Sequence, residues 1–225
     1  QEKPNGTILT NWPRNEWTPP CHYFLYAALC GVGKEMTDAV IIIGIYGDKK
    51  RWLDIASKRA IPSAMEQGVP VIISYDHTLA RARNAAGFAT SAEWLIFLDA
   101  DDQLSSGYVD ALMEAEGDLR APAVQFIKHG IPQKAELLND RDIEAINPCV
   151  IGTAIRQKMF AEIGGFQEFS AWEDYALFLK AYRRGAKITH NEKAVYVVHA
   201  SNNSRNNSIS DPGLFSSIHS ASWGA

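Results

Sequence analysis

The stretch E-W-L-I-F-L-D-A-D-D, residues 93–102, joins a short apolar run to three acids within four positions. The run W-L-I-F-L has the length of a strand and no polar residue, which is typical of a strand buried on both faces of a sheet. Because crossover connections leave a crevice at the carboxyl ends of parallel strands, side chains at such an end commonly contact ligands. The sequence therefore places a candidate site at Asp99, Asp101 and Asp102.

The residues upstream alternate between strand-like and helix-like segments. The strand-like runs are continuous and rich in β-branched residues, whereas the segments between them carry apolar residues at helical spacing. This alternation predicts an α/β fold with a doubly wound, Rossmann-like half. We expect strands at 7–10, 39–45, 69–74 and 94–98, and helices at 21–30, 51–60 and 79–89.

The composition is that of an ordinary globular chain. With 225 residues, of which 46% are hydrophobic and 21% charged, the chain fits one domain with a sizeable core. The formal net charge of -4 gives no general attraction to nucleic acid or to anionic membranes. Three cysteines without metal-ligand spacing indicate reduced side chains in a cytoplasmic protein, and no apolar run predicts a membrane span or a signal peptide.

The acids after the strand at 94–98 are a candidate metal site. Successive side chains of an extended segment point to opposite sides, so Asp99 and Asp101 are expected to project together while Ala100 and Asp102 face away. Two converging carboxylates repel each other without a cation, and their oxygens suit Mg²⁺ or Mn²⁺. The alternative is that the acids merely end the strand and cap a helix near Ser105, an interpretation that stays equally open for Asp102.

Two segments of the chain resemble a known enzyme family. A-R-A-R-N-A-A-G-F-A-T-S-A-E-W-L-I-F-L-D-A-D-D, residues 80–102, is similar to the signature of family 2 glycosyltransferases of the GT-A fold, in which an A-R-N-x-G helix leads into a strand ending in a D-x-D metal motif. E-I-G-G-F-Q-E-F-S-A-W-E-D-Y-A-L-F-L-K-A-Y-R-R-G, residues 162–185, resembles the G-G-F segment and E-D helix of that family. The resemblance covers most of residues 7–200 and implies a GT-A fold, a Rossmann-like mixed sheet with mostly parallel strands flanked by helices.

The resemblance also implies a donor site for a nucleoside-diphosphate sugar, most commonly a UDP-sugar. The loop at 11–14 and Asp48 would contact the nucleotide, and the guanidinium groups of Arg81 and Arg83 would suit its diphosphate. The alternative is that both arginines are simply solvated. The implied donor-binding residues are Asn11, Pro13, Arg14, Asp48, Asp76, Arg81, Arg83, Asn84, Asp99, Ala100, Gly165, Trp172, Glu173 and Arg205.

The helix expected after residue 170 carries the candidate catalytic base. S-A-W-E, residues 170–173, has the pattern of a capping box, in which Ser170 caps the helix and Glu173 reaches back to it. Asp174 is needed by neither this box nor the apolar stripe that follows, and the helix dipole favours it as an anion. It matches the acid that the resemblance implies as the catalytic base, the alternative being a solvated acid of the first turn.

The alternating run A-V-Y-V-V-H-A, residues 194–200, predicts a last strand that ends at His199. The resemblance implies that a histidine after the E-D helix can join Asp99 and Asp101 as a third metal ligand; the alternative is a histidine hydrogen-bonded at a strand end. The polar segment that follows could fold over the bound donor as a lid, with Arg205 near the diphosphate, or could be disordered.

These expectations combine into one GT-A domain over residues 1–225. Residues 7–102 form its nucleotide-sugar-binding half, 103–199 its acceptor half and 200–225 a polar tail or lid. The predicted activity is that of an inverting glycosyltransferase of the hexosyltransferase type with Mn²⁺ or Mg²⁺ as cofactor. Asp174 would deprotonate the acceptor hydroxyl, which attacks the anomeric carbon opposite the departing diphosphate.

Two other functions stay open. A nucleotidyltransferase would share the doubly wound half and the metal carboxylates, but it needs a glycine-rich phosphate loop, and T-N-W-P-R-N-E-W after the first predicted strand has no glycine. A non-catalytic nucleotide-sugar-binding module would not need the base. No pattern in the second half identifies the acceptor, which stays unknown.

Overall fold

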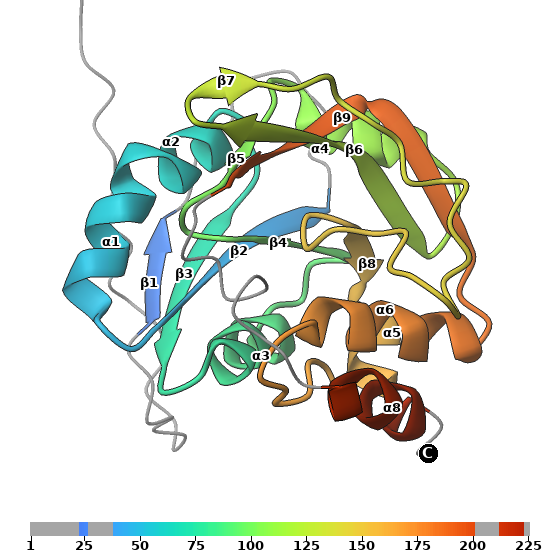
Figure 1. Ribbon diagram of the computed structural model, residues 1–225. Helices are drawn as coiled ribbons and strands as arrows, with labels where there is room; N and C mark the ends of the chain where they lie inside the picture. The colour runs from blue at the N-terminus through green and yellow to red at the C-terminus, as the bar shows by residue number, and fades with distance from the viewer. Residues whose placement is uncertain (1–22, 27–37, 201–211, 223–225) are drawn as a thin grey trace, which may run out of the picture.

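The structure, a computed structural model, describes residues 23–26, 38–200 and 212–222 (Figure 1). Within them the strands form one mixed sheet in the order β1-β3-β2-β4-β8-β6-β9-β5, with β7 paired to β6. The strands are β1 (Tyr23–Tyr26), β2 (Ala39–Tyr46), β3 (Val71–Asp76), β4 (Trp94–Leu98), β5 (Gln103–Leu104), β6 (Leu119–Lys128), β7 (Ile131–Pro132), β8 (Ala154–Arg156) and β9 (Ile188–His199). The helices are α1 (Lys49–Lys58), α2 (Ala60–Met65), α3 (Leu79–Ala89), α4 (Tyr108–Glu114), α5 (Gln157–Glu162), α6 (Glu173–Arg183) and α8 (Pro212–Ala221).

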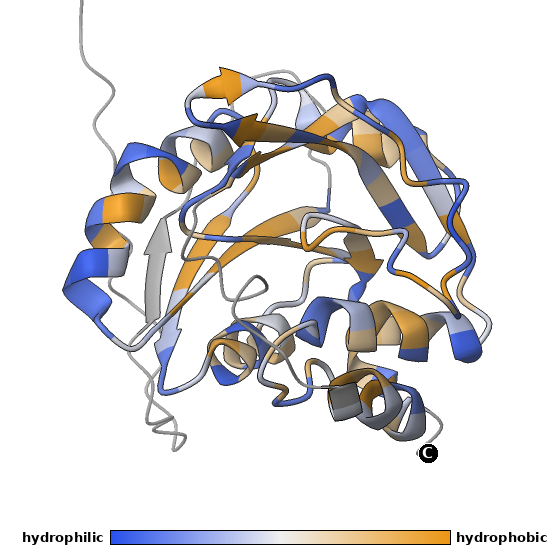
Figure 2. Ribbon diagram, in the orientation of Figure 1, coloured by the Kyte–Doolittle hydropathy of each residue, from blue (hydrophilic) through white to orange (hydrophobic). Residues whose placement is uncertain are grey.

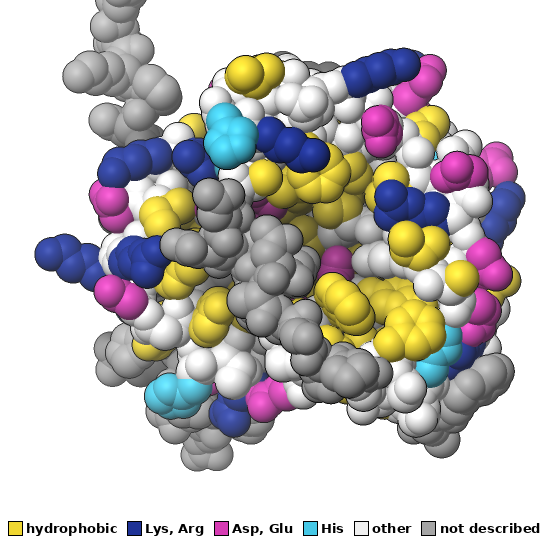
Figure 3. Space-filling view, viewed as in Figure 1, with side chains coloured by type: hydrophobic (Ala, Val, Ile, Leu, Met, Phe, Trp, Pro, Cys, Tyr) yellow, Lys and Arg dark blue, Asp and Glu magenta, His cyan; other side chains and the backbone are white. Residues whose placement is uncertain are grey.

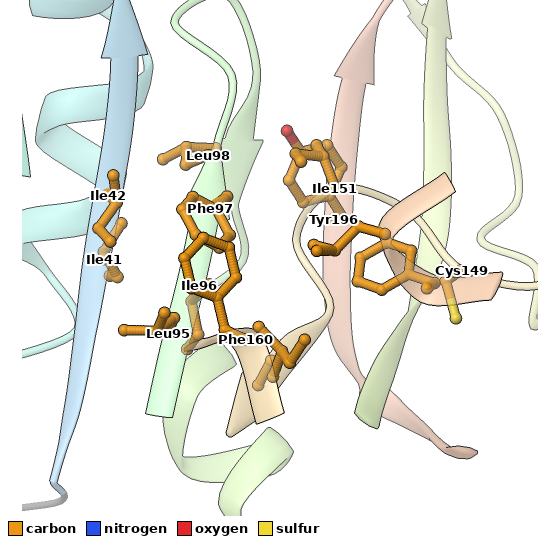
Figure 4. Close-up of a cluster of buried hydrophobic side chains, with 14 of the residues drawn as sticks. Ile41, Ile42, Leu95, Ile96, Phe97, Leu98, Cys149, Ile151, Phe160 and Tyr196 are labelled. Atoms are coloured by element: carbon orange, nitrogen blue, oxygen red, sulfur yellow. The ribbon is translucent and has the colours of Figure 1, made fainter. Parts of the chain in front are cut away.

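The three central parallel strands form as the sequence predicts. Strand β2 pairs in parallel with β3 on one side and with β4 on the other. Residues 41–43 of β2 and 95–98 of β4 are fully buried, and both strands are hydrophobic along their length (Figure 2). Phe160 of α5 packs on Phe97 with ring centroids 5.5 Å apart (Figure 4). Each such side chain contributes about 1.5–3 kcal/mol by leaving water, so burial on both faces anchors β4 and the acids that follow it.

The prediction of a helix at 21–30 is wrong for its central residues. Residues 23–26 form β1, which pairs antiparallel with β3 from Tyr23 opposite Ser74 to Tyr26 opposite Val71. The edge of β3 would otherwise leave backbone N–H and carbonyl groups unpaired, and the aromatic residues of Y-F-L-Y favour a strand. The strand predicted at 7–10 lies outside the described residues.

Strand β8 joins the two parts of the sheet. It runs antiparallel to β4 on one side and to β6 on the other. Strands β6 and β9 pair in parallel, with an irregularity between Pro122 and Ala123, where proline supplies no backbone donor. Tyr196 of β9 is fully buried, and its hydroxyl accepts the backbone N–H of Asp99 at 3.2 Å. The end of β9 therefore lies beside the end of β4.

Helix α8 packs against α6 near the end of the chain. Leu214 and Ile218 are buried, and Nη1 of Arg183 donates to the carbonyl oxygen of His219 at 2.8 Å. Residues 200–225, predicted to be a polar tail or lid, thus contain a packed helix, for which the spacing of Leu214 and Ile218 is a signal. The lid residues 201–211 lie outside the described residues. None of the described helices combines the length and the apolar character needed to cross a membrane.

Candidate active site

A cleft of about 1200 Å³ opens at the carboxyl ends of β2 and β4. Its walls come from the end of β2, helices α1 and α8, the turn after β4, the loop before β8, the start of α6 and the end of β9. In Figure 3 hydrophobic side chains surround this hollow, and an acidic side chain is visible in its depth. The predicted site residues that line the cleft are Arg83, Asp99, Ala100, Asp101, Trp172, Glu173, Asp174 and His199.

The chain turns immediately after β4. The N–H of Asp102 donates to the carbonyl oxygen of Asp99 at 3.1 Å, so residues 99–102 form a turn and do not continue the strand. The strict alternation expected for these side chains is therefore wrong, because it holds only for extended backbone. Asp99 and Asp101 nevertheless line the same cleft. Burial, followed by the negative charge of Asp99, raises the pKa of Asp101.

Asp102 ties the turn to β9. The residue is 6% exposed, and its Oδ1 accepts the backbone N–H of His199 at 2.9 Å. Burial, then the charges of Asp99 and Asp101, raise the pKa of Asp102 well above its ordinary value. The N-cap residue of α4 is Gly107, so Asp102 does not cap that helix. We call residues 99–102 the acid turn.

Arg83 joins the two acidic motifs inside the protein. With 2% of its side chain exposed, it donates from Nη1 to Oε1 of Glu173 at 2.9 Å and from Nη2 to Oδ1 of Asp99. Although burial acts to lower it, the charges of Asp99, Glu173 and Asp174 raise the pKa of Arg83. A Cβ at Gly44 of β2 would stand 2.9 Å from Cγ of Arg83, so glycine leaves the room that Arg83 needs. Both terminal nitrogens of Arg83 thus donate hydrogen bonds to carboxylates of the protein.

Asn84 of α3 and Gly165 lie at the contact between α3 and the loop before α6. The Asn84 amide donates from Nδ2 to the carbonyl oxygen of Phe166 and accepts its N–H at Oδ1, both at 2.8 Å. Gly165 has φ of 70°, and a Cβ there would stand 2.5 Å from Oδ1 of Asn84. These contacts join the A-R-N segment of α3 to the G-G-F segment before α6. Neither Asn84 nor Gly165 lines the cleft, and their predicted contact with the donor stays a prediction.

Helix α6 begins without the predicted capping box. Its N-cap residue is Trp172, with φ of 58° and no side-chain cap, and the helix starts at Glu173. Glu173 is 4% exposed and binds Arg83 instead of reaching back to Ser170. The capping-box prediction is wrong because the buried guanidinium of Arg83 requires counter-charges, and this requirement outweighs the gain from a side-chain cap.

Asp174 faces the cleft from the first turn of α6. Burial, followed by the charge of Glu173, raises the pKa of Asp174 to about 6. Its Oδ2 lies 3.4 Å from Nδ2 of Asn147, whose Oδ1 accepts the backbone N–H of Cys149 at 3.0 Å. A carboxylate with this pKa is largely ionised at neutral pH and is still a useful proton acceptor. The loop before β8 therefore holds Asn147 against the candidate base, a contact that no local pattern of the sequence indicates.

His199 stands at the end of β9, as predicted, but its ring has a protein partner. Its Nε2 lies 2.6 Å from Oε1 of Gln103, and burial, followed by the charge of Arg59, lowers its pKa. In the part of the chain that the structure describes, no group of three or more His, Cys, Asp and Glu side chains is arranged to hold a metal ion. Asp99 and Asp101 fit Mg²⁺ or Mn²⁺ by donor type, although one oxygen of Asp99 is bound to Arg83.

The remaining predicted donor residues lie away from the cleft or outside the described residues. Asp48 is exposed and caps α1, accepting the N–H of Arg51 at 3.1 Å. Asp76 ends β3, is 8% exposed and lies 3.3 Å from Nε of Arg81. Neither carboxylate nor Arg81 lines the cleft. The predicted residues outside the described ranges are Asn11, Pro13, Arg14 and Arg205.

Helix α1 supplies cleft residues that sequence reasoning missed. Arg51, Lys58 and Arg59 line the cleft, together with Trp52. Nη1 of Arg59 donates to the carbonyl oxygen of Asp101 at 3.2 Å. Positions 51 and 58 fall on one face of α1, and with Arg59, the C-cap residue of that helix, they form the basic cluster that could have identified this wall of the cleft.

Comparisons with known proteins show similarity in sequence and in fold over much of the chain. No family model matches the chain. An uncharacterized glycosyltransferase of Haemophilus influenzae (strain ATCC 51907 / DSM 11121 / KW20 / Rd) is 27% identical over 150 residues, which are 57% of this chain and 50% of that protein. The chain thus spans about half the length of the curated relative it matches.

Solved structures of S. aureus TarS residues 1–349 share the fold. The complex with UDP-GlcNAc has a TM-score of 0.56 at 18% identity, covering 80% of this chain and 64% of TarS 1–349. The complex with UDP has a TM-score of 0.53 at 18% identity, with 82% and 64% covered. The curled mixed α/β sheet flanked by helices is therefore similar to that of TarS, which confirms the fold class predicted from the sequence. The chain is glycosyltransferase-like in sequence and in fold.

Proposed function

We propose that the chain is an inverting glycosyltransferase of the family 2 type, which moves a hexose from a UDP-sugar to an acceptor hydroxyl. The observation that carries the proposal is that Arg83 binds both Asp99 of the acid turn and Glu173 beside Asp174, so that both acidic motifs line one cleft. The sequence similarity to a glycosyltransferase and the fold shared with TarS, whose structures hold UDP-GlcNAc and UDP, support it.

Asp174 is the proton acceptor in this proposal. With a pKa of about 6 it is ionised at neutral pH and takes the proton of the acceptor hydroxyl. The hydroxyl oxygen then bonds to the anomeric carbon on the face opposite the diphosphate, and the bond from that carbon to the diphosphate oxygen breaks. The configuration at the anomeric carbon inverts, and no sugar is attached to the protein during transfer.

Asp99 and Asp101 are the proposed ligands of a Mn²⁺ or Mg²⁺ ion. When bound there, such an ion neutralises charge that develops on the departing diphosphate. Asp99 has 35% of its side chain exposed while it holds Arg83, so it can serve both partners. Asp102 stays with the backbone of His199 and fixes the turn. His199 could join as a third ligand only by giving up its contact with Gln103.

A donor-cleavage assay tests the proposal. The chain is incubated with Mn²⁺ and a panel of nucleotide sugars and nucleoside triphosphates, and the released nucleoside diphosphate or pyrophosphate is measured. We expect diphosphate release from a nucleotide sugar, reduced by ~10² to 10⁴ in Asp174→Asn. Pyrophosphate release from a triphosphate with a sugar phosphate would instead indicate a nucleotidyltransferase. Binding of a nucleotide sugar without turnover would indicate a non-catalytic module.

A further inference from the structure

The charges of the cleft pose a problem for a diphosphate ligand. The acid turn carries three carboxylates, and a diphosphate that approaches it is repelled unless cations lie close by. Arg83, which the sequence suggested for this role, has 2% of its side chain exposed and is bound to Asp99 and Glu173. A free cationic side chain beside the acid turn would therefore add to the charge that the proposed metal ion supplies to the diphosphate.

Arg59 is placed to supply that charge. It lines the cleft, is partly exposed, and donates from Nη1 to the carbonyl oxygen of Asp101 at 3.2 Å. A guanidinium has five N–H donors in a fixed fork, so this single bond leaves donors for oxygens of a ligand. Among the residues that the structure describes, no carboxylate lies within ion-pair distance of Arg59.

The backbone around Arg59 fixes where its side chain starts. Arg59 sits between α1 and α2, with φ of -133° and ψ of -75°, its N–H donating to Ala56 and its carbonyl accepting from Ser63, both at 3.3 Å. Oγ of Ser63 also accepts the N–H of Leu104 at 3.2 Å, which joins α2 to the strand that follows the acid turn. The cation is thus held beside the acid turn by hydrogen bonds on both sides of the helix break.

The other cations that line the cleft are less suited to this position. Lys58 is paired with Asp54 at 2.7 Å. Arg51 lies two helical turns earlier on α1, with its guanidinium 5.7 Å from the centroid of the Trp52 ring. Arg141 belongs to the loop before β8 and donates to the carbonyl oxygen of Asn147 at 3.1 Å. Arg59 is distinguished from them by its direct bond to the acid turn.

We infer that Arg59 binds the diphosphate of the donor. The inference rests on the proposed function and extends it, because it assigns the phosphate contact to the break between α1 and α2 and leaves Arg83 as a residue that positions Asp99 and Glu173.

The test compares UDP with uridine, which lacks the diphosphate. Calorimetric titrations are made in EDTA, so that a metal held by the acid turn cannot account for any difference. The variants are Arg59→Ala, Arg59→Lys and the control Lys50→Ala, which removes the same charge from an exposed position of α1. We expect the wild-type protein to bind UDP more tightly than uridine, and Arg59→Ala to weaken UDP binding by about 10- to 100-fold while uridine binding is unchanged. Arg59→Lys should lie between, and Lys50→Ala should match the wild type.

Several outcomes would overturn the inference. These are equal affinity of the wild-type protein for UDP and uridine in EDTA, unchanged UDP affinity in Arg59→Ala, an equal loss for both ligands, or a loss that occurs only with Mn²⁺. The last would show that Arg59 acts through the acid turn alone. If the wild-type protein binds neither UDP nor any nucleotide sugar, with or without Mn²⁺, the proposed function itself is wrong. If the wild-type protein binds UDP and Arg59→Ala binds it equally well, only this inference is wrong.

Discussion

Among single residues, Asp174 gives the most direct link between structure and chemistry. Its pKa of about 6 predicts that transfer rises with pH through about 6, because only the ionised carboxylate accepts a proton. A pH profile of kcat with one nucleotide sugar measures this rise in the transfer rate. Asp174→Asn should retain donor binding and lose transfer, and a comparable loss of donor affinity would mark Asp174 as a pocket residue.

The same carboxyl should also leave a signature in stability. An aspartate of the unfolded chain has a pKa of about 3.9, so between about pH 4 and pH 6 the unfolded chain ionises first, and the folded state loses stability as the pH rises. Asp174→Asn removes this pH-dependent cost. We therefore expect the increase in Tm caused by Asp174→Asn to be larger at pH 7 than at pH 4, as measured by thermal unfolding. A Tm difference that does not change with pH would contradict the raised pKa.

Among the structural elements, the ion pairs of Arg83 connect α3, the acid turn and α6. Arg83→Ala removes the guanidinium that binds the buried Glu173 and the partly buried Asp99, and breaking a buried ion pair of this kind costs about 3–5 kcal/mol. Arg81→Ala is the matched control on the same helix, because its side chain is 55% exposed and its ion pair with Asp76 is worth at most about 1 kcal/mol. Urea unfolding of both variants measures the difference, and similar losses would show that Arg83 has no special structural role.

The contact between Asn84 and the loop before α6 can be tested by two neighbouring glycines. Gly164 and Gly165 both have positive φ, but a Cβ meets nothing within 4 Å at Gly164, whereas at Gly165 it would stand 2.5 Å from Oδ1 of Asn84. Both alanine variants should lose about 1–3 kcal/mol through backbone strain, with the larger loss in Gly165→Ala. Equal losses of unfolding free energy would mean that the Asn84 contact does not constrain this loop.

The elements also show what the sequence could and could not predict. The parallel strands β2, β3 and β4 were predictable, because strands covered on both faces need continuous apolar runs. The role of Glu173 was not predictable, because its partner Arg83 lies 90 positions away and a local sequence pattern cannot indicate such a contact. Strand β1 was missed for the same reason, since the edge of β3 determines its conformation.

For the whole molecule, the sheet explains why distant segments meet at one cleft. Strand β8 links β4 to β6, and β9 brings its end to the acid turn through the bond between His199 and Asp102. The resemblance of two motifs predicted that the acids would face one site. The two motifs include neither Asn147 nor the cations of α1 and its C-cap, whose places at the cleft depend on how helices and loops pack around the sheet.

The central claim is that the acid turn supports nucleotide-sugar-dependent transfer, and UDP release from a UDP-sugar by Asp101→Asn tests it most directly. Asp101 is partly exposed, and burial together with Asp99 raises its pKa, so the ionised carboxylate does not stabilise the fold at neutral pH, and the substitution should leave the fold intact without lowering the Tm. We predict that the wild-type protein releases UDP with Mn²⁺ and much more slowly in EDTA, and that Asp101→Asn shows only the slow, Mn²⁺-independent rate. A folded Asp101→Asn protein that releases UDP at the wild-type rate with Mn²⁺ would contradict the account.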